Sequence, residues 1–257
     1  MKDAMAHSVR LMAARDMHAW ACDSRKQSCG LSGMLAKKRN AVDAVAYHAD
    51  LADVWEQQYQ QPAFRDRASV LEGCLSDNLC DQQWLDAGCG SGTLTRQLAK
   101  RGCHVVGMDA AGDMITVART LSTNCERIRF EQIETVAVLP LLDASLDGIL
   151  CSSVMEYLPD PVGCLTEFAR VLRPEGRLIV TVPNRRSLVR RWHRSLHCMG
   201  RLMGRPWCLY LDHSHNDYTS KGFRVLLDEQ GFVTHKIMPF GVGGNSLLGF
   251  SCSRRLL

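Results

Sequence analysis

From Trp84 onward, short apolar runs alternate with longer segments in which apolar residues recur every three or four positions. The short runs predict β-strands and the longer segments predict amphipathic helices. The expected strands cover residues 84–87, 104–108, 127–132, 147–152, 177–182, 233–238 and 246–253, and the expected helices cover residues 94–100, 113–121, 161–172 and 219–230. Strands that alternate with helices form right-handed crossovers. The expected fold class is therefore α/β, a doubly wound, mostly parallel seven-stranded sheet with helices on both faces.

The N-terminal part of the chain has a different pattern. Residues 1–40 show no sustained period and end in a stretch rich in Gly, Ser and Lys, which predicts a mobile basic extension. Residues 41–60 have apolar side chains at helical spacing and predict a pair of amphipathic helices, followed by a helix over residues 64–75. We therefore expect an N-terminal extension at residues 1–40 and a single domain at residues 41–257.

The composition is that of an ordinary globular protein. Of the 257 residues, 46% are hydrophobic and 23% are charged, and no apolar run reaches the roughly 18–20 residues that a membrane span needs. The 12 cysteines include no Cys-x-x-Cys pair, which disfavours a zinc ribbon or a redox motif and favours reduced thiols. Charged residues interrupt the apolar positions near the N-terminus, so no secretory signal is expected. These features predict a cytoplasmic protein.

A glycine-rich turn between the first strand and the next helix carries the most specific chemistry. It runs Asp86-x-Gly88-x-Gly90-x-Gly92, at the carboxyl edge of the sheet, where ligands bind. Glycine lets the backbone turn sharply and approach a ligand closely. Thr93 stands in place of the third glycine of the dinucleotide fingerprint, which disfavours a pyrophosphate ligand. An acid inside the loop suits a ligand with an ammonium or sulfonium group.

Asp109 ends the second expected strand, where an acid accepts hydrogen bonds from both ribose hydroxyls of a nucleoside. Residues 85–92 and 105–109 resemble motifs I and II of class I S-adenosylmethionine-dependent methyltransferases. The resemblance continues in order through three later segments, residues 130–136, 147–161 and 171–184. It is strongest with the small-molecule branch, which includes the ubiquinone-pathway O-methyltransferases, and it implies a Rossmann-like fold with S-adenosylmethionine as the cofactor.

The resemblance also implies a set of cofactor-binding residues on the loop and at the strand ends. They are Asp86, Gly88, Gly90, Gly92, Met108, Asp109, Ala110, Ile133, Glu134 and Ser152. Within this set, the glycines line the methionine side of the cofactor, Asp86 helps to hold its amino group and Asp109 binds the ribose. Met108 or Ala110 lies against the adenine. Ile133 and Glu134 lie near the adenine amino group, and Ser152 lies beside the transferable methyl group.

The expected catalytic residues follow from the chemistry of methyl transfer. The reaction is an in-line displacement, in which the protein mainly aligns the reactants and excludes water, although a positioned base can take the acceptor's proton. The candidates for this base are Glu156, Tyr157, His213 and His215. Tyr157 stands where the family usually has a His, and no third ligand accompanies the His-x-His pair, so no metal is expected. The alternative is that these polar residues only shape a loop.

The net charge of +4 is unevenly distributed, because residues 185–205 hold seven Arg and no acid. Apolar positions recur at helical spacing across residues 184–206, which predicts an Arg-rich helical insert. The resemblance favours a lid over the acceptor site. A basic amphipathic helix is also typical of a membrane-surface anchor, and its arginines could pair with a carboxylate, phosphate or sulfate on the acceptor. A nucleic-acid surface is disfavoured, since no Asn/Asp-Pro-Pro-Tyr/Phe signature follows the fourth strand.

These features together predict an enzyme that transfers a methyl group from S-adenosylmethionine to a small organic acceptor, at oxygen. Two alternatives stay open, an RNA- or protein-modifying methyltransferase and a catalytically silent S-adenosylmethionine-binding partner protein. The expected partner is the small-molecule acceptor, and contact of the Arg-rich insert with a membrane surface is a further hypothesis. No pattern in the chain indicates an oligomeric state.

Overall fold

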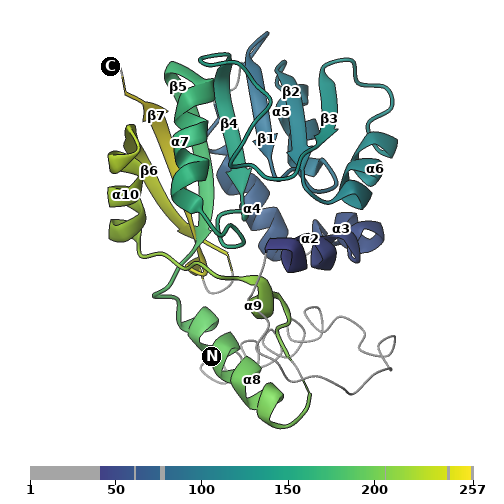
Figure 1. Ribbon diagram of the computed structural model, residues 1–257, viewed down its shortest axis with the longest axis vertical. Helices are drawn as coiled ribbons and strands as arrows, with labels where there is room; N and C mark the ends of the chain where they lie inside the picture. Colours follow the sequence, from purple (N-terminus) through teal and green to yellow (C-terminus); the bar gives the residue numbers. More distant parts are fainter. Residues whose placement is uncertain (1–40, 61, 76–78, 206, 242–243, 256–257) are drawn as a thin grey trace, which may run out of the picture.

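The computed structural model describes residues 41–60, 62–75, 79–205, 207–241 and 244–255. The extension predicted at residues 1–40 lies outside the described residues. The described chain forms a central sheet with helices on both faces, and one helix projects away from this body (Figure 1).

Within the described residues, seven strands form one sheet. Their bounds are β1 Gln83–Ala87, β2 His104–Asp109, β3 Ile128–Gln132, β4 Leu146–Ser152, β5 Leu172–Pro183, β6 Phe232–Phe240 and β7 Leu247–Arg254. The order across the sheet is β3-β2-β1-β4-β5-β7-β6. The first five strands are parallel, and β7 runs antiparallel to both β5 and β6. The predicted doubly wound, mostly parallel sheet is confirmed.

The central strands are continuous apolar runs because helices cover the sheet on both sides. Residues 178–182 of β5, for example, are all buried. This strand begins earlier than predicted, at Leu172, which pairs with Leu146 of β4. The next strand pair along joins Gly148 to Arg177, so the register shifts and the residues predicted as a turn bulge out of the ladder.

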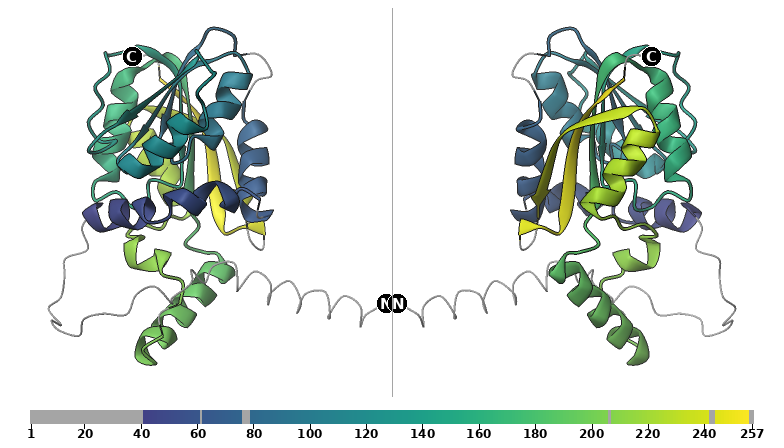
Figure 2. Two further views of the ribbon diagram at one scale, coloured as in Figure 1. Left: turned by 90° about the vertical axis from the view of Figure 1, so that its right-hand side faces the viewer. Right: turned by 90° about the vertical axis from the view of Figure 1, so that its left-hand side faces the viewer.

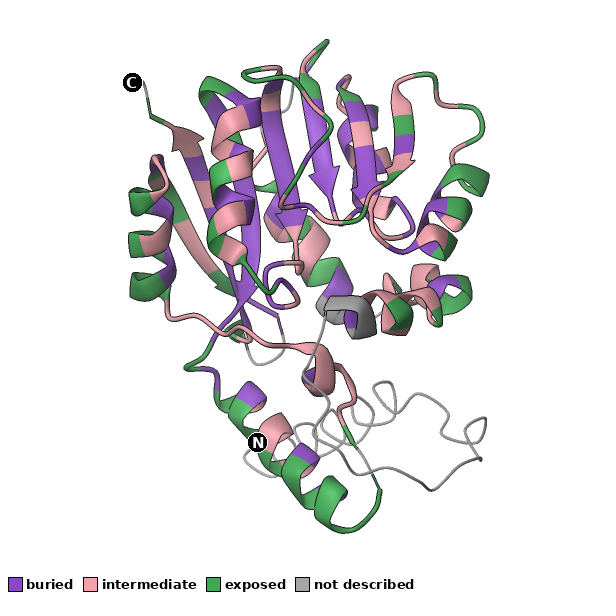
Figure 3. Cartoon of the chain, viewed as in Figure 1, coloured by how far each residue is buried: buried purple, intermediate pink, exposed green. Residues whose placement is uncertain are grey.

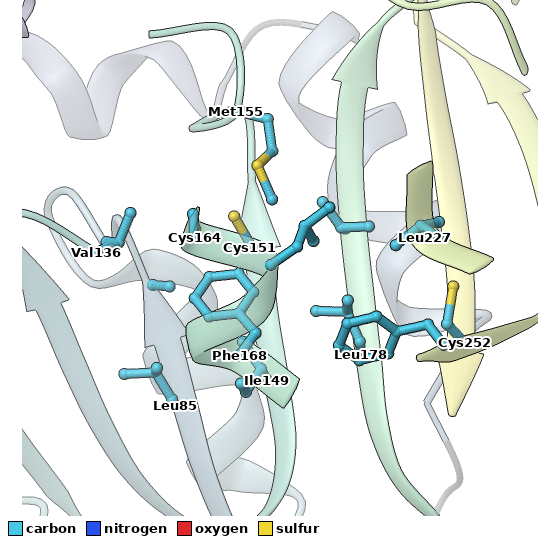
Figure 4. Close-up of a cluster of buried hydrophobic side chains, with 14 of the residues drawn as sticks. Leu85, Val136, Ile149, Cys151, Met155, Cys164, Phe168, Leu178, Leu227 and Cys252 are labelled. Atoms are coloured by element: carbon cyan, nitrogen blue, oxygen red, sulfur yellow. The ribbon is translucent and has the colours of Figure 1, made fainter. Parts of the chain in front are cut away.

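Nine helices are described around the sheet. Their bounds are α2 Ala41–Ala49, α3 Ala52–Gln58, α4 Pro62–Glu72, α5 Thr93–Lys100, α6 Gly112–Thr120, α7 Pro161–Val171, α8 Leu188–Leu202, α9 Tyr210–His213 and α10 Ser220–Glu229. Apolar residues of α4 and α5 form one core with the sheet, and those of α7 and α10 form another on the opposite face. In the second core, Phe168 of α7 packs among Leu85 and Ile149 of the sheet (Figure 4).

Two features of this fold position the candidate site. Helices α2 and α3 lie across the edge of the sheet at which β1, β2 and β4 end (Figure 1). Helix α8 lies inside the segment predicted as an Arg-rich insert and projects beyond the same edge (Figure 2). Most of its surface is exposed, whereas the strand interiors are buried (Figure 3). The space at the carboxyl edge of the sheet is therefore bounded by α2, α3 and the first turns of α8.

Candidate active site

The glycine loop after β1 passes close to its neighbours on both sides. The backbone N–H groups of Gly88 and Cys89 donate to the carbonyl oxygen of Met108 at 2.8 and 3.0 Å. Gly88 has a φ of +72°, and a Cβ at this position would lie 2.2 Å from Cγ2 of Val154. A Cβ at Gly90 would lie 3.1 Å from Nε1 of Trp55. The loop therefore needs glycine for its conformation and for the close approach of its backbone.

A carboxylate on α3 holds the far half of this loop in place. Glu56 accepts hydrogen bonds from the hydroxyls of Ser91 and Thr93 at 2.7 and 2.8 Å, and forms an ion pair with Arg96 at 2.7 Å. Burial raises the pKa of Glu56, but the two hydroxyls and the guanidinium lower it by more, so its pKa lies below the ordinary value. Glu56 carries no signal in the sequence, because the contact joins segments that are 35 residues apart in the chain.

The two acids singled out in the sequence have different environments. Asp109 accepts hydrogen bonds from the backbone N–H groups of Gly90 and Ala111, both at 2.9 Å, and so ties the loop to the end of β2. Asp86 is buried and accepts a hydrogen bond from the Thr95 hydroxyl at 2.6 Å. Burial raises the pKa of Asp86 to about 7. Asp109 is thus the more accessible of the two acids for a polar ligand.

A cavity of about 780 Å³ opens at this edge, within the range of roughly 300–1,000 Å³ that is usual for small-molecule and cofactor sites. Seven of the ten expected cofactor-binding residues line it. They are Asp86, Gly88, Gly90, Asp109, Ala110, Glu134 and Ser152. These residues come from the ends of β1, β2 and β4 and from the loops that follow β1, β2 and β3. The cavity therefore unites parts of the chain that the sequence motifs place far apart.

The other three expected cofactor residues lie outside the cavity lining. Gly92 caps α5 and packs inward, since a Cβ there would lie 2.6 Å from the ring of Phe130. Met108 is fully buried in the core on the α7 side of the sheet, and Ile133 packs against that same core. The pleat of β2 explains why Met108 lies in the core and not in the cavity, because successive side chains of a strand point to opposite faces of the sheet and not along its edge.

Of the expected catalytic residues, Glu156 and Tyr157 line the cavity and the two histidines do not. His213 stacks on the ring of Tyr47, with the ring centroids 4.8 Å apart, and the backbone N–H of His215 donates to the carbonyl oxygen of Glu156 at 2.7 Å. Burial raises the pKa of both Glu156 and Tyr157. The histidines thus lie in a layer behind the cavity wall.

His48 of α2 lines the cavity, although sequence analysis did not single it out. Its Nδ1 lies 2.7 Å from the carbonyl oxygen of Ala44. Because a carbonyl only accepts hydrogen bonds, Nδ1 carries the proton, and Nε2 of the neutral ring bears a free lone pair. The ring packs edge-on against Trp55 and Tyr157, with centroids 5.4 and 4.9 Å away. Burial lowers the pKa of His48, which favours this neutral form.

Two arginines in the cavity wall were not singled out individually in the sequence. Arg67 of the α4 helix lies with its guanidinium carbon 4.7 Å from the ring centroid of Phe64, and its buried Nε has no hydrogen-bond partner among the described residues. Arg190 of α8 lines the cavity from the opposite end of the chain. In the sequence, Arg67 is only an arginine near the apolar face of a predicted helix, and Arg190 is only one of the seven arginines of residues 185–205. Neither feature is specific enough to predict a site.

Comparisons with known proteins agree with this geometry. Residues 85–180 match a family model described as a methyltransferase domain. A ubiquinone biosynthesis O-methyltransferase of Idiomarina loihiensis is 28% identical over 181 residues, which cover 70% of this chain and 72% of that protein. The chain carries a class I S-adenosylmethionine-dependent methyltransferase domain. A ubiquinone biosynthesis O-methyltransferase of Xylella fastidiosa is 38% identical over 104 residues, which cover 39% of this methyltransferase and 42% of that protein.

Solved structures show the same fold. An S-adenosylmethionine-dependent methyltransferase of Thermotoga maritima is 17% identical with a TM-score of 0.63, and covers 82% of this chain and 99% of its own. The [4+2]-cyclase SpnF is 12% identical with a TM-score of 0.66, and covers 88% of this chain and 100% of its own. At these identities the likeness concerns the fold alone. The sequence match to the Xylella relative spans less than half of that protein's length, so its whole activity is not transferred by similarity.

The cavity fits S-adenosylmethionine, which is the cofactor of this methyltransferase. The glycine loop presents bare backbone to the cavity, where any Cβ would collide or take up the space. The Asp109 carboxylate at its rim keeps lone pairs beyond its two backbone hydrogen bonds, since a carboxylate offers about four acceptor sites. The buried Nε of Arg67 is a donor without a hydrogen-bond partner among the described residues, and an acidic ligand group would satisfy it.

Proposed function

We propose that this methyltransferase moves the methyl group of S-adenosylmethionine to an oxygen atom of a small aromatic acceptor. One observation carries the proposal. A single cavity runs from the glycine loop to a group of aromatic side chains on α2, α3 and α9, which include Tyr47, Trp55 and Tyr210. Aromatic walls suit a flat acceptor ring. The names of the relatives, O-methyltransferases of ubiquinone biosynthesis, support oxygen as the attacked atom.

The cofactor end of the cavity supplies a contact for each part of S-adenosylmethionine. When bound, the cofactor supplies a methyl group on a positively charged sulfur. In this proposal the free lone pairs of Asp109 accept from the ribose hydroxyls, and Ala110 and Glu134 lie on the adenine side. The backbone at Gly88 contacts the methionine part. Arg67 binds the methionine carboxylate with the N–H that has no partner among the described residues.

His48 is the residue that we propose for taking the acceptor's proton. A base must present a lone pair toward the hydroxyl that it deprotonates. The bond from Nδ1 to Ala44 orients the ring and leaves Nε2 with a lone pair, and the ring lies in the cavity wall beside Tyr157. Tyr157 itself stays protonated because burial raises its pKa, so it acts as part of the wall and not as a base.

The test of the proposed function compares phenols with anilines of matched shape. Purified enzyme is incubated with S-adenosylmethionine and either 3,4-dihydroxybenzoate or 3,4-diaminobenzoate, and release of S-adenosylhomocysteine is followed. We expect release with the phenol to exceed release with the aniline by at least about tenfold, because a cavity that pairs a base with an O–H donor discriminates against the wrong group. Equal release with both, or no release with any phenol tried, catechol included, would refute methyl transfer to a phenolic oxygen.

Helix α8 supports a second proposal, contact with an anionic membrane surface. Five large apolar residues lie within a stripe about 100° wide at 3.6 residues per turn, and all are exposed. They are Leu188, Trp192, Met199, Leu202 and Met203, with Leu202 89% and Trp192 61% exposed. The buried positions of the same helix are Arg190, His197 and Gly200, so the apolar face points away from the protein.

Four exposed arginines lie on α8 or just before it, and their positive charge suits lipid headgroups of negative charge. They are Arg185, Arg186, Arg191 and Arg201. An outward apolar face on a helix rich in exposed arginine is typical of a helix that lies in the membrane interface. No helix among the described residues has the length and apolar character to cross a bilayer. The proposed contact is therefore a surface one, through a helix that also forms one wall of the cavity.

Trp192→Ser and Leu202→Ser together should abolish binding to vesicles of phosphatidylglycerol and phosphatidylcholine in a flotation assay. The expected loss of affinity is roughly 150-fold or more, since burial of each exposed side chain in the interface would contribute about 1.5–3 kcal/mol. A matched control is Val225→Ser with Val233→Ser, which removes two exposed apolar side chains on the α10 and β6 side of the molecule. Vesicle binding by the α8 variant at the level of the control would contradict the proposal.

A further inference from the structure

One arginine of α8 differs from the others in where it lies. Arg190 is 7% exposed and lines the cavity, whereas Arg185, Arg186, Arg191 and Arg201 are exposed to solvent. Taking a guanidinium out of water is costly unless its charge and its N–H groups find partners. The partners of Arg190 therefore show whether the protein alone satisfies this group.

The described residues accept only some of the hydrogen bonds that the guanidinium of Arg190 can donate. Its Nη2 lies 3.3 Å from Oδ1 of Asp217 and 3.5 Å from the hydroxyl of Ser214, while its buried Nε has no hydrogen-bond partner among the described residues. Asp217 also forms an ion pair with Arg194 through its other oxygen. One carboxylate thus serves two guanidinium groups.

A second acid, Glu156 in the cavity lining, interacts with Arg190 without forming an ion pair with it in the described part of the chain. Glu156 is buried and lines the cavity, and it interacts electrostatically with Arg190 and with Arg67. It forms an ion pair with neither of them within the described part of the chain, and its buried Oε2 has no hydrogen-bond partner there. The Nε of Arg190 and the Oε2 of Glu156 are thus a donor and an acceptor without a partner among the described residues, on two side chains that line the same cavity.

The surroundings of Arg190 are aromatic. Its guanidinium carbon lies 5.6 Å from the ring centroid of Tyr210, and Tyr210 lies 3.0 Å from Nδ1 of His193, another cavity residue. The planar fork of arginine is suited to a carboxylate, which it can bind through two parallel hydrogen bonds. A flat ring with an acidic substituent would place the ring against the aromatic wall and the carboxylate on the fork.

We propose that the methyl acceptor is an aromatic hydroxy acid, whose carboxylate binds Arg190 and whose hydroxyl side faces Glu156 and His48. The proposal rests on the proposed function and names the class of its acceptor. It makes Arg190 a specificity-determining residue, which selects acidic phenols over neutral ones. It also explains why an arginine is buried on a helix whose apolar residues point to solvent.

The test measures binding of two probes that differ only in the carboxylate. Enzyme saturated with S-adenosylhomocysteine is titrated with 3,4-dihydroxybenzoate and with catechol by calorimetry. We expect the wild-type protein to bind the acid roughly 10- to 100-fold more tightly, which is the range for a hydrogen bond to a charged group. Arg190→Gln should bring the two probes to within about twofold of each other, and Arg190→Lys should leave an intermediate preference, because a point charge replaces the fork.

Arg191→Gln, an exposed neighbour on the same helix, is the matched control and should keep the full preference for the acid. Equal affinity of the wild-type protein for both probes, binding of neither, or a preference that survives Arg190→Gln would overturn the proposal. The wild-type comparison decides the matter even where a variant does not fold. Because methyl transfer is not measured, a negative result here leaves the proposed reaction standing, whereas absence of S-adenosylhomocysteine release with any phenol removes the reaction itself.

Discussion

Replacing Asp109 with alanine is expected to weaken S-adenosylmethionine binding on the order of a hundredfold or more. The change removes the acceptor for the ribose hydroxyls, and each hydrogen bond to a charged group is worth about 1.5–3 kcal/mol. It also releases the backbone N–H groups of Gly90 and Ala111, which the carboxylate holds at 2.9 Å, so the glycine loop loses its tether to β2. Calorimetric titration of the variant with S-adenosylmethionine measures the effect.

Two comparisons separate ligand binding from a loss of folding. Asp113→Ala removes an exposed acid in the first turn of α6, four residues away, and should leave the affinity within about twofold of wild type. Circular dichroism and thermal unfolding of Asp109→Ala should show a folded protein with a somewhat lower Tm. If the folded Asp109→Ala variant binds S-adenosylmethionine as tightly as the wild type, the assignment of the ribose site is wrong.

Replacing His48 with glutamine is expected to lower kcat about 10²- to 10⁴-fold, the range for loss of a general base, with little change in the affinity for S-adenosylmethionine. Glutamine keeps the size of the side chain and a donor for the carbonyl of Ala44, but it cannot take a proton at neutral pH. His104→Gln, at the exposed start of β2, is the matched control and should keep full activity. Single-turnover rates measured with 3,4-dihydroxybenzoate distinguish the two variants.

The pH dependence gives an independent check on His48. Burial lowers the pKa of His48 most, and the charge of His213 also lowers it. The backbone hydrogen bond to Ala44 and the charge of Asp109 raise it, and the net effect places the pKa below the ordinary value of 6.5. Since the base must be unprotonated, kcat should hold as pH falls to the ordinary histidine range and decline only below about pH 6.5. In His48→Gln that decline should vanish. An unchanged acid limb, or a kcat close to wild type, would show that another group takes the proton.

The sheet was predictable because its signal is local. Runs of buried apolar residues mark each parallel strand, and helices at regular intervals imply crossovers, so seven strands and their approximate bounds follow from the pattern. The antiparallel placement of β7 between β5 and β6 does not follow from it, since strand direction depends on which chain segments meet in space. The position of the glycine loop and of Asp109 at the cavity was predictable for a related reason, because it depends on placement at a strand end.

The glycines show where local reasoning stops. Gly88 and Gly92 have the same residue type and similar positive φ values of +72° and +79°. Only the neighbours tell them apart, because Gly88 faces Val154 at the cavity and Gly92 faces Phe130 in the core. Those neighbours come from other parts of the chain, so the motif alone assigned both glycines to the cofactor.

His48, and Arg190 among the seven arginines of the insert, could not be singled out from the sequence for a different physical reason. A periodic pattern shows that a helix has two faces, but it does not show which face meets the rest of the protein. In α8 the apolar face points outward and Arg190 points into the cavity, the reverse of the usual arrangement. His48 lies near Tyr157 only because α2 crosses the carboxyl edge of the sheet, 109 residues earlier in the chain. Such residues become visible only once the fold is known.

The most direct test of the central claim follows the methyl group itself. The enzyme is incubated with S-adenosylmethionine labelled with ¹³C at the methyl carbon and with 3,4-dihydroxybenzoate, and the product is analysed by NMR and mass spectrometry. We predict one labelled methyl group on a phenolic oxygen, formed in step with S-adenosylhomocysteine. Label on carbon, nitrogen or the carboxylate, or cofactor turnover without a labelled phenol ether, would contradict the account.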